Sequence, residues 1–352
     1  MVTMAGIFRA DIYDVLSDNN IPWDELSKCT VMVTGATGLI GSFLVHVLSE
    51  ANVKYGLDMR LIAHVRNRNK VEALAREPGL EFIYGDIRRP VMMAGVTDRL
   101  DYIFHCASVT KSADMTSKPV DVTTTAAQGT LNMLELAKGN QCKSFVYLSS
   151  MEFYGQTKRR KVDERDSGYL DLSSPRSSYP ESKRFCEMLC TAYAAQYEVP
   201  VKIARLAQTF GSGTPRDDTR VFAQFARSAA TGGDIELHTE GKSRGNYCYT
   251  ADTVRGLLTI LLKGESGQAY NIANTAASVT IREMAELVAT DVCDGKIKVV
   301  INIPEDIEKR GYAPDVAYTL NADKLKDLGW TPKYGLAEMY TRMITDWQER
   351  LI

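Results

Sequence analysis

Short apolar runs alternate with amphipathic stretches over the first 210 residues of the chain. The runs are rich in Val, Ile, Phe and Tyr, and their side chains are apolar on both faces, as in strands that are buried within a parallel sheet. We expect strands at Thr30–Thr34, Arg60–Val65, Glu81–Tyr84, Tyr102–Cys106, Ser144–Ser149 and Val201–Leu206.

The stretches between these runs have the period of helices. After the first strand, apolar residues recur at the spacing of a helix that packs on a sheet. They are Ile40, Phe43, Leu44, Val47 and Leu48. Gly129–Lys138 and Ser182–Tyr197 follow the same pattern. This alternation predicts an α/β fold with a doubly wound parallel Rossmann sheet, which we assign to residues 29–210.

The pattern becomes less regular after residue 210. Residues 211–218 form a turn-rich segment, which we expect to be a mobile loop. Helices are expected around Arg220–Thr231, Thr250–Leu262 and Ile281–Thr290, and short strands near Ile235–His238 and Lys298–Ile301. We therefore assign residues 211–352 mainly to a smaller, C-terminal substrate-binding lobe, with exchange of chain between the two lobes.

Residues 1–28 precede the first strand as an N-terminal extension. Its apolar residues have the spacing of a short amphipathic helix. They are Ile7, Phe8, Ile12, Val15 and Leu16. We expect this helix to pack against the outside of the sheet, in preference to serving as an arm that binds a partner.

A glycine-rich loop links the first strand to the first helix. Gly35 permits a tight turn, Gly38 lets backbone N–H groups approach a pyrophosphate, and Gly41 brings the helix close to the strand. The N-terminus of the helix adds free N–H donors and partial positive charge. This strand–loop–helix arrangement predicts a dinucleotide site. Further loop contacts are expected from Thr37, Leu39 and Ile40.

The end of the second strand bears on the choice of dinucleotide. Enzymes that select NAD usually place a carboxylate there for the ribose 2′-hydroxyl, whereas a 2′-phosphate favours Arg. This chain has Arg66, Arg68 and Lys70 there and no carboxylate, so NADP is favoured over NAD. After the third strand, Asp86 is expected to reach the adenine amino group, with Ile87 beside it.

Four polar residues provide candidate chemistry near the fifth strand. Tyr179 and Lys183 share one face of a helix, so the ammonium is expected to lower the pKa of the phenol. The phenolate can then take a proton from a substrate hydroxyl as hydride leaves the same carbon. If the end of the fifth strand stays extended, Ser150 and Glu152 project to the same side.

Taken together, these motifs resemble the extended short-chain dehydrogenase/reductases, and more narrowly their nucleotide-sugar epimerase/dehydratase branch. The resemblance runs from about Thr30 to Trp347. Its motifs are the glycine loop, Phe104-His-Cys-Ala107, the Ser-Ser-x-x-x-Tyr-Gly segment, YxxxK, Arg244 before Tyr247-Cys-Tyr249-Thr-Ala-Asp252, Ala269–Ala273 and Leu328–Lys333.

The resemblance implies a role for each candidate residue. Ser150 would bind the sugar oxygen being oxidised, Tyr179 would be the base, and Lys183 would bind the nicotinamide ribose. Ala107 would line the cofactor channel, and Arg244 would pair with the diphosphate of the sugar nucleotide. Gln208 and Arg220 are further substrate-binding candidates.

In the branch that this chain resembles, the residue at the position of Glu152 differs with the reaction. Dehydratases and glucuronate decarboxylases often carry a Glu at the position of Glu152, whereas simple 4-epimerases usually do not. One dehydratase type has Asp-Glu where this chain has Met151-Glu152, and Gln208 replaces a usual Asn. Arg244 lies one residue farther from Asp252 than is usual.

The expected function is therefore transient oxidation at C4 of a nucleoside-diphosphate sugar, followed by elimination, decarboxylation or epimerisation. Two alternatives stay open. One is an NADPH-dependent reductase of a keto-sugar or small carbonyl, and the other is a non-catalytic NADP-binding scaffold. The resemblance further implies a homodimer formed by the helices around Thr123–Lys138 and Ser182–Tyr197.

Composition and charge disfavour several classes of protein. Hydrophobic residues make up 45% of the 352-residue chain, and the formal net charge is −2, which does not favour a nucleic-acid partner. The basic run Lys158–Lys161 is interpreted as a solvated loop. Four His and seven Cys without metal-ligand spacing predict no metal and reduced thiols. With no apolar run long enough for a bilayer and no secretory signal, we expect no membrane association and a cytoplasmic location.

Overall fold

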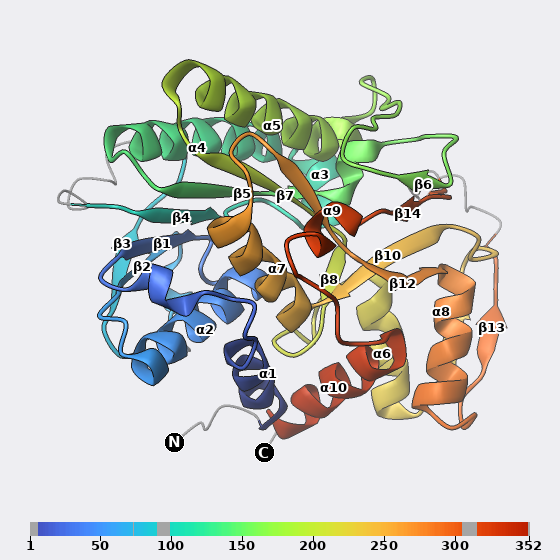
Figure 1. Cartoon of the computed structure of the whole chain (residues 1–352). Helices are drawn as coiled ribbons and strands as arrows, with labels where there is room; N and C mark the ends of the chain where they lie inside the picture. The colour runs from blue at the N-terminus through green and yellow to red at the C-terminus, as the bar shows by residue number, and fades with distance from the viewer. Residues whose placement is uncertain (1–5, 73, 90–98, 305–314, 351–352) are drawn as a thin grey trace.

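The largest sheet positions the candidate site. The computed structural model describes residues 6–72, 74–89, 99–304 and 315–350, in which seven parallel strands have the order β11-β7-β5-β4-β1-β2-β3 (Figure 1). The strands are β1 (Thr30–Thr34), β2 (Arg60–Val65), β3 (Leu80–Tyr84), β4 (Tyr102–His105), β5 (Ser144–Ser150), β7 (Val201–Leu206) and β11 (Ala269–Ile272). The order reverses between β1 and β4, so a crevice for a ligand is expected at the carboxyl ends of these strands. The doubly wound Rossmann fold is confirmed.

Helices cover both faces of this sheet. The main covering helices are α2 (Leu39–Tyr55), α4 (Pro119–Gly139), α5 (Ser178–Tyr197) and α7 (Thr250–Lys263), and α3 (Ser112–Ser117) precedes α4. Figure 1 shows α4 and α5 side by side on one face and α2 and α7 on the other. Short 3-10 turns join the elements at η1 (Trp23–Leu26), η2 (Arg68–Lys70), η4 (Met151–Tyr154) and η5 (Pro175–Ser177).

Apart from the N-terminal extension, three small sheets and four helices build the rest of the described chain. The sheets are β12 (Asn274–Thr280) with β10 (Arg244–Tyr249) and β8 (Gln208–Phe210), β13 (Val299–Ile301) with β9 (Ile235–Leu237), and β14 (Thr319–Leu320) with β6 (Lys161–Val162). The helices are α6 (Val221–Thr231), α8 (Ile281–Leu287), which continues into the π-helical turn η6 (Val288–Val292), α9 (Asp323–Lys326) and α10 (Leu336–Glu349).

The chain passes between these parts more than once. β11 returns to the edge of the large sheet beside β7, and β6 leaves the first part to pair with β14. A single boundary at residue 210 therefore cuts across hydrogen-bonded strands. The division into 1–28, 29–210 and 211–352 stays a prediction.

The apolar run of α7 forms part of the largest buried cluster. Val254, Leu257, Leu258 and Ile260 have no solvent exposure, so this helix serves as a buried layer beneath the sheet. None of the helices in the described ranges has both the length and the apolar character needed to cross a membrane.

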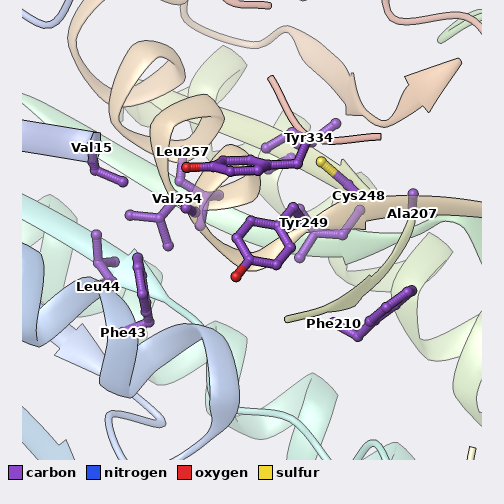
Figure 2. Packing of buried hydrophobic residues seen from close by; sticks show 14 of the residues in the cluster. Val15, Phe43, Leu44, Ala207, Phe210, Cys248, Tyr249, Val254, Leu257 and Tyr334 are labelled. Carbon is purple, nitrogen blue, oxygen red and sulfur yellow. The ribbon is translucent and has the colours of Figure 1, made fainter. Parts of the chain in front are cut away.

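The N-terminal extension contains the expected helix, α1 (Gly6–Leu16). Phe8, Ile12, Val15 and Leu16 are buried, whereas Ile7 is only half-buried. The helix packs on α2, α7 and α10, and therefore on the helical layer instead of on the sheet itself. Figure 2 shows Val15 beside Leu44 of α2 and Val254 of α7.

Glycines allow α2 to approach the sheet closely. Gly35 has φ +64°, and a Cβ added there would lie 2.8 Å from the Ala107 nitrogen at the end of β4. A Cβ on Gly41 would lie 2.4 Å from the Gly35 carbonyl oxygen. Since real Cβ atoms do not come this close to backbone, both positions require glycine.

Gly41→Ala is expected to lower the free energy of unfolding by about 1–3 kcal/mol, because the new methyl group must displace backbone. Gly139→Ala is the control, since a Cβ at Gly139 meets nothing within 4 Å. Urea unfolding of both variants measures the effect. Equal midpoints for the two variants would contradict the close packing at Gly41.

Candidate active site

The glycine loop presents the start of α2 at the switch point of the sheet. Gly38 is the N-cap residue, and it provides no side-chain acceptor for the first N–H groups of α2. These donors and the partial positive charge of the helix are suited to a pyrophosphate. Thr37, Leu39 and Ile40 are half-buried in the same loop, which matches their expected place at a dinucleotide site.

A buried polar network links the end of β1, just before the glycine loop, to the end of the neighbouring strand β4 and to α4. The Thr34 hydroxyl accepts a hydrogen bond from the Ala107 N–H at 3.2 Å and lies 2.9 Å from His105 Nδ1. His105 Nε2 lies 3.2 Å from the Thr130 hydroxyl of α4. Burial lowers the pKa of His105 to about 3, so the ring is neutral and acts as a fixed link. This link between Thr34 and His105 was not predicted from the sequence, in which His105 belongs to a family motif and Ala107 is expected to line the cofactor channel.

Lys183 and Tyr179 lie together beneath the carboxyl end of β5. The Lys183 ammonium donates a hydrogen bond to the Leu148 carbonyl at 2.7 Å and lies 5.6 Å from the centre of the Tyr179 ring and 5.0 Å from that of Tyr147. Lys183 is almost completely buried, and burial lowers its pKa to about 8. The predicted placement of the pair on one helix face is therefore present.

The expected lowering of the Tyr179 pKa is not present in the free protein. The pKa of Tyr179 is raised above its ordinary value, first because the phenol is buried and second because the Glu152 carboxylate is near. A hydrogen bond with Ser150 and the charges of Arg176 and Arg220 act in the opposite direction but are weaker. The phenol is therefore neutral in the protein alone, which corrects the simple expectation from i, i+4 spacing.

Ser150 and Glu152 reach the site by a different route from the one predicted. β5 ends at Ser150, which is itself extended, but the chain turns into η4 at Met151, so the extended backbone does not continue to Glu152. The Ser150 hydroxyl accepts a hydrogen bond from the Glu152 N–H at 3.2 Å. The Glu152 carboxylate lies 2.9–3.0 Å from one guanidinium nitrogen of Arg176, which precedes α5. The turn brings Glu152 near Tyr179, although the predicted alternation of side chains was wrong.

A buried ion pair fixes the η4 turn. Arg205 of β7 pairs with Glu187 of α5 at 2.7 Å and lies 3.5 Å from the centre of the Phe153 ring. Its guanidinium also donates to the Tyr154 hydroxyl at 3.1 Å. Since both charges are buried and mutually satisfied, η4 is held between β7 and α5. Arg176, Arg205 and Glu187 were not predicted from the sequence as site residues. The only signal was the charge of Arg205 within an apolar run.

The residues expected around the adenosine half of a dinucleotide differ in their surroundings. Arg66 and Lys70 are exposed after β2, and Arg68 lies 4.4 Å from the centre of the Tyr84 ring. Asp86 forms an ion pair with Arg88 at 2.6 Å, and this contact lowers the pKa of Asp86 to about 2. The Asp86 carboxylate thus already has a partner in Arg88. The contact of Asp86 with adenine stays a prediction.

Ile87 is buried beneath α4, where a Cβ on Gly129 would approach it to 2.9 Å. Its carbonyl accepts a hydrogen bond from the Asn132 side chain at 2.8 Å. Ile87 therefore fixes the chain after β3 through its backbone and its packing.

The substrate-binding candidates fall into two places. Arg220 forms a 2.6 Å ion pair with Asp218, and its charge acts on Tyr179. Gln208 is half-buried at the start of β8, in register with Tyr247 of β10. Arg244 lies where β10 meets β12, donates to the Ser278 carbonyl at 2.5 Å and is 3.7 Å from Glu283. The charge of Arg220 therefore acts on Tyr179, whereas the Arg244 side chain is held by residues of β12 and α8.

Comparisons with known proteins identify the family of this chain. The model of the NAD dependent epimerase/dehydratase family matches residues 31–273. A UDP-glucuronic acid decarboxylase of Arabidopsis thaliana is 31% identical over 92% of this chain and 90% of that protein.

Two solved structures have the same fold. An epimerase of Methanothermobacter thermautotrophicus has a TM-score of 0.79 at 23% identity, over 97% of this chain and 96% of that chain. A dTDP-glucose 4,6-dehydratase of Bacillus anthracis, in complex with NAD, has a TM-score of 0.73 at 22% identity, over 91% and 97%. This chain belongs to the NAD-dependent epimerase/dehydratase family and is an enzyme of that class.

Without a bound dinucleotide, Tyr179 is expected to stay protonated up to pH 10 and above, because burial and Glu152 raise its pKa. The ultraviolet difference between the wild type and Tyr179→Phe should therefore contain no tyrosinate band below pH 10. Tyr13→Phe, at an exposed tyrosine, is the control substitution for the difference spectrum. A tyrosinate band from Tyr179 at pH 7–8 would contradict the expected direction.

Proposed function

We propose that this enzyme decarboxylates a nucleoside-diphosphate hexuronic acid through a transient ketone at C4. The observation that carries the proposal is the arrangement of Ser150, Tyr179 and Lys183 with the Glu152–Arg176 ion pair beside them. The similarity to a UDP-glucuronic acid decarboxylase supports the same choice. A UDP-hexuronate is accordingly the first substrate to test.

The first step is oxidation at C4. Ser150 holds the C4 oxygen, and Tyr179 takes its proton as the C4 hydride leaves. A bound dinucleotide would supply the acceptor and later the donor of this hydride, and the positive charge of its nicotinamide ring would favour the phenolate. The buried Lys183 ammonium has the position to bind the nicotinamide ribose, as the resemblance implies.

The second step breaks the bond between C5 and C6. A C4 ketone makes the C6 carboxylate that of a β-keto acid, so CO₂ can leave with the bonding electrons passing into an enolate. A proton then adds to C5. Glu152 is the acid that we assign to this transfer, after its carboxylate has taken up a proton from solvent. Hydride returns to C4 and Tyr179 returns the proton to O4, so the cofactor is regenerated in each turnover.

Met151 favours decarboxylation over elimination. Loss of a C6 hydroxyl needs an acid to protonate the leaving group, and the buried Met151 side chain offers none. Departure of CO₂ needs no such acid. Arg176 and Arg220 act on Tyr179 and are suited to face the anionic groups of the substrate. Gln208 and Arg244 are proposed to bind its nucleotide portion.

UDP-glucuronate is expected to release CO₂ and yield a UDP-pentose without added reductant, whereas UDP-glucose and dTDP-glucose yield no dehydrated product. Glu152→Gln should lower kcat by about 10²–10⁴-fold, because it removes a proton donor and acceptor. Glu181→Gln is the matched control on the same helix as Tyr179. NMR of the products and measurement of CO₂ check the outcome. Dehydration of a neutral sugar, or turnover of none in a broad panel, would refute the proposal.

The three cations after β2 support a preference for NADP within this NAD-dependent family. Arg66, Arg68 and Lys70 are exposed, and residues 66–70 contain no carboxylate. NADP⁺ is therefore expected to bind about 10-fold or more tightly than NAD⁺. Arg66→Ala with Lys70→Ala should remove this difference, and Lys298→Ala is a control at a distant surface. Calorimetric titration measures both constants, and tighter NAD⁺ binding by the wild type would exclude the preference.

The same basic segment favours a second function, an NADPH-dependent reductase of a keto-sugar or small carbonyl. Stoichiometric consumption of NADPH during turnover distinguishes it, since the proposed decarboxylase regenerates its cofactor. A non-catalytic scaffold is disfavoured by the placement of Ser150, Tyr179 and Lys183.

The outer surface of α4 and α5 supports a homodimer. Val120 on α4 and Phe185 and Met188 on α5 are exposed apolar residues, and the two helices pack side by side on one face of the sheet (Figure 1). Burial of these side chains against a second copy removes apolar surface from water.

Phe185→Glu with Met188→Glu is expected to convert the dimer into a monomer, because charges replace the apolar contact. Val53→Glu, at an exposed apolar residue of α2, should leave the mass unchanged. Light scattering after gel filtration measures the mass. A monomeric wild type would refute the dimer.

The cysteines support a location in the cytoplasm. All seven are free in the structure, and Cys142, Cys186, Cys190 and Cys248 are among the buried ones. Free thiols are typical of a reducing compartment.

A further inference from the structure

The first and last helices enclose the loop that follows β8. α1 and α10 lie side by side near the two chain ends (Figure 1). Both lie outside residues 31–273, which match the family model. The loop residues Gly211, Ser212 and Thr214 are buried, so the expectation of a mobile loop is wrong for its first half.

Asp11 of α1 holds this loop through a buried carboxylate. It accepts hydrogen bonds from the Ser212 hydroxyl and, at 2.5 Å, from the Tyr249 hydroxyl. Arg342 of α10 pairs with the same carboxylate, with its Nε at 3.0 Å. Because Asp11 has no solvent exposure, its charge depends on these three partners. Figure 2 shows the Tyr249 ring beside the Tyr334 ring in the buried hydrophobic cluster.

α10 holds the next two loop residues. The buried Asp346 carboxylate accepts a hydrogen bond from the Gly213 N–H at 2.9 Å. The Trp347 indole donates to the Thr214 carbonyl at 2.6 Å. The loop is therefore fixed by a side chain of α1 and by two side chains of α10.

The loop contacts the cofactor-binding side of the site. Gly213 has φ +88°, and a Cβ there would lie 3.1 Å from the Phe8 ring of α1 and 3.3 Å from Leu39. Leu39 is the first residue of α2, whose N-terminus faces the expected pyrophosphate. A shift of the loop would therefore disturb the start of α2.

The loop also leads to the substrate side. Its second half contains Asp218, which pairs with Arg220 at 2.6 Å, and Arg220 acts on Tyr179. Arg227 of α6 donates to the carbonyls of Arg216 and Asp218 at 2.9 and 2.7 Å. The position of Arg220 thus depends on a segment that is anchored at Ser212–Thr214.

We propose that Asp11 is a positioning residue, which sets the 211–218 loop so that Arg220 and Leu39 are placed for substrate and dinucleotide. The proposal rests on the proposed function for the identity of the substrate. It assigns the N-terminal extension a role in binding at the site. Asp11 itself touches neither substrate nor cofactor.

The test compares Asp11→Asn, Ser212→Ala and the double variant with the wild type. Asp14→Asn is the matched control, because Asp14 lies on the same helix and pairs with Lys333 at 2.7 Å, away from the loop. kcat and KM for UDP-glucuronate and Kd for UDP and for the dinucleotide are measured well below each unfolding midpoint. Ser212→Ala leaves the Asp11–Arg342 pair in place, so it reports on the loop even if Asp11→Asn folds poorly.

Both single variants are expected to raise KM and the Kd for UDP by about 10-fold, with kcat changed less than about 3-fold. The KM and Kd of the double variant should be no higher than those of the more impaired single variant, because both substitutions break the same contact. Asp14→Asn should stay within about 2-fold of the wild type. A lower unfolding midpoint with unchanged KM and Kd would overturn the inference and leave Asp11 as a stabilising residue only. If the wild type turns over no nucleotide sugar, the proposed function fails, and the Kd values for UDP and the dinucleotide decide the inference alone.

Discussion

The buried contact between the Lys183 ammonium and the Leu148 carbonyl determines how α5 lies on β5. Removing an ammonium from water is unfavourable, as the lowered pKa of Lys183 indicates. The short hydrogen bond and the neighbouring rings of Tyr147 and Tyr179 offset that cost when α5 lies in this position along β5. Tyr179, one turn before Lys183 on α5, is therefore fixed beside Ser150 at the end of β5.

The charges around Tyr179 explain why the protein by itself does not ionise this phenol. Burial and Glu152 favour the neutral form, and Arg176 only partly offsets Glu152 because it is paired with that same carboxylate. A cationic ring or an anionic substrate changes this balance directly. The Glu152–Arg176 pair consequently links the protonation of Tyr179, which is the base in the proposed mechanism, to what is bound.

Residues far apart in the chain support the site from outside the sheet. Arg205 and Glu187 hold the turn that carries Glu152, and Asp11 holds the loop that leads to Arg220. In both cases a buried charge is satisfied by groups from several elements, so loss of one partner leaves the others unpaired. The less regular parts of the chain are thereby joined to the carboxyl ends of the strands of the large sheet, where the ligand crevice is expected.

The sequence alone determined the features that depend on local spacing. Alternating apolar runs gave the parallel strands, Gly35 and Gly41 marked the close turn, and the interval between Tyr179 and Lys183 placed both on one helix face. Only the tertiary structure decided the return of β11 to the sheet, the turn that moves Glu152, the partners of Asp86 and the direction of the pKa shift of Tyr179. Asp11 and Ser212 are 201 positions apart in the sequence. Burial and pairing at such separations arise only when the chain is folded, so they cannot be predicted from local sequence patterns.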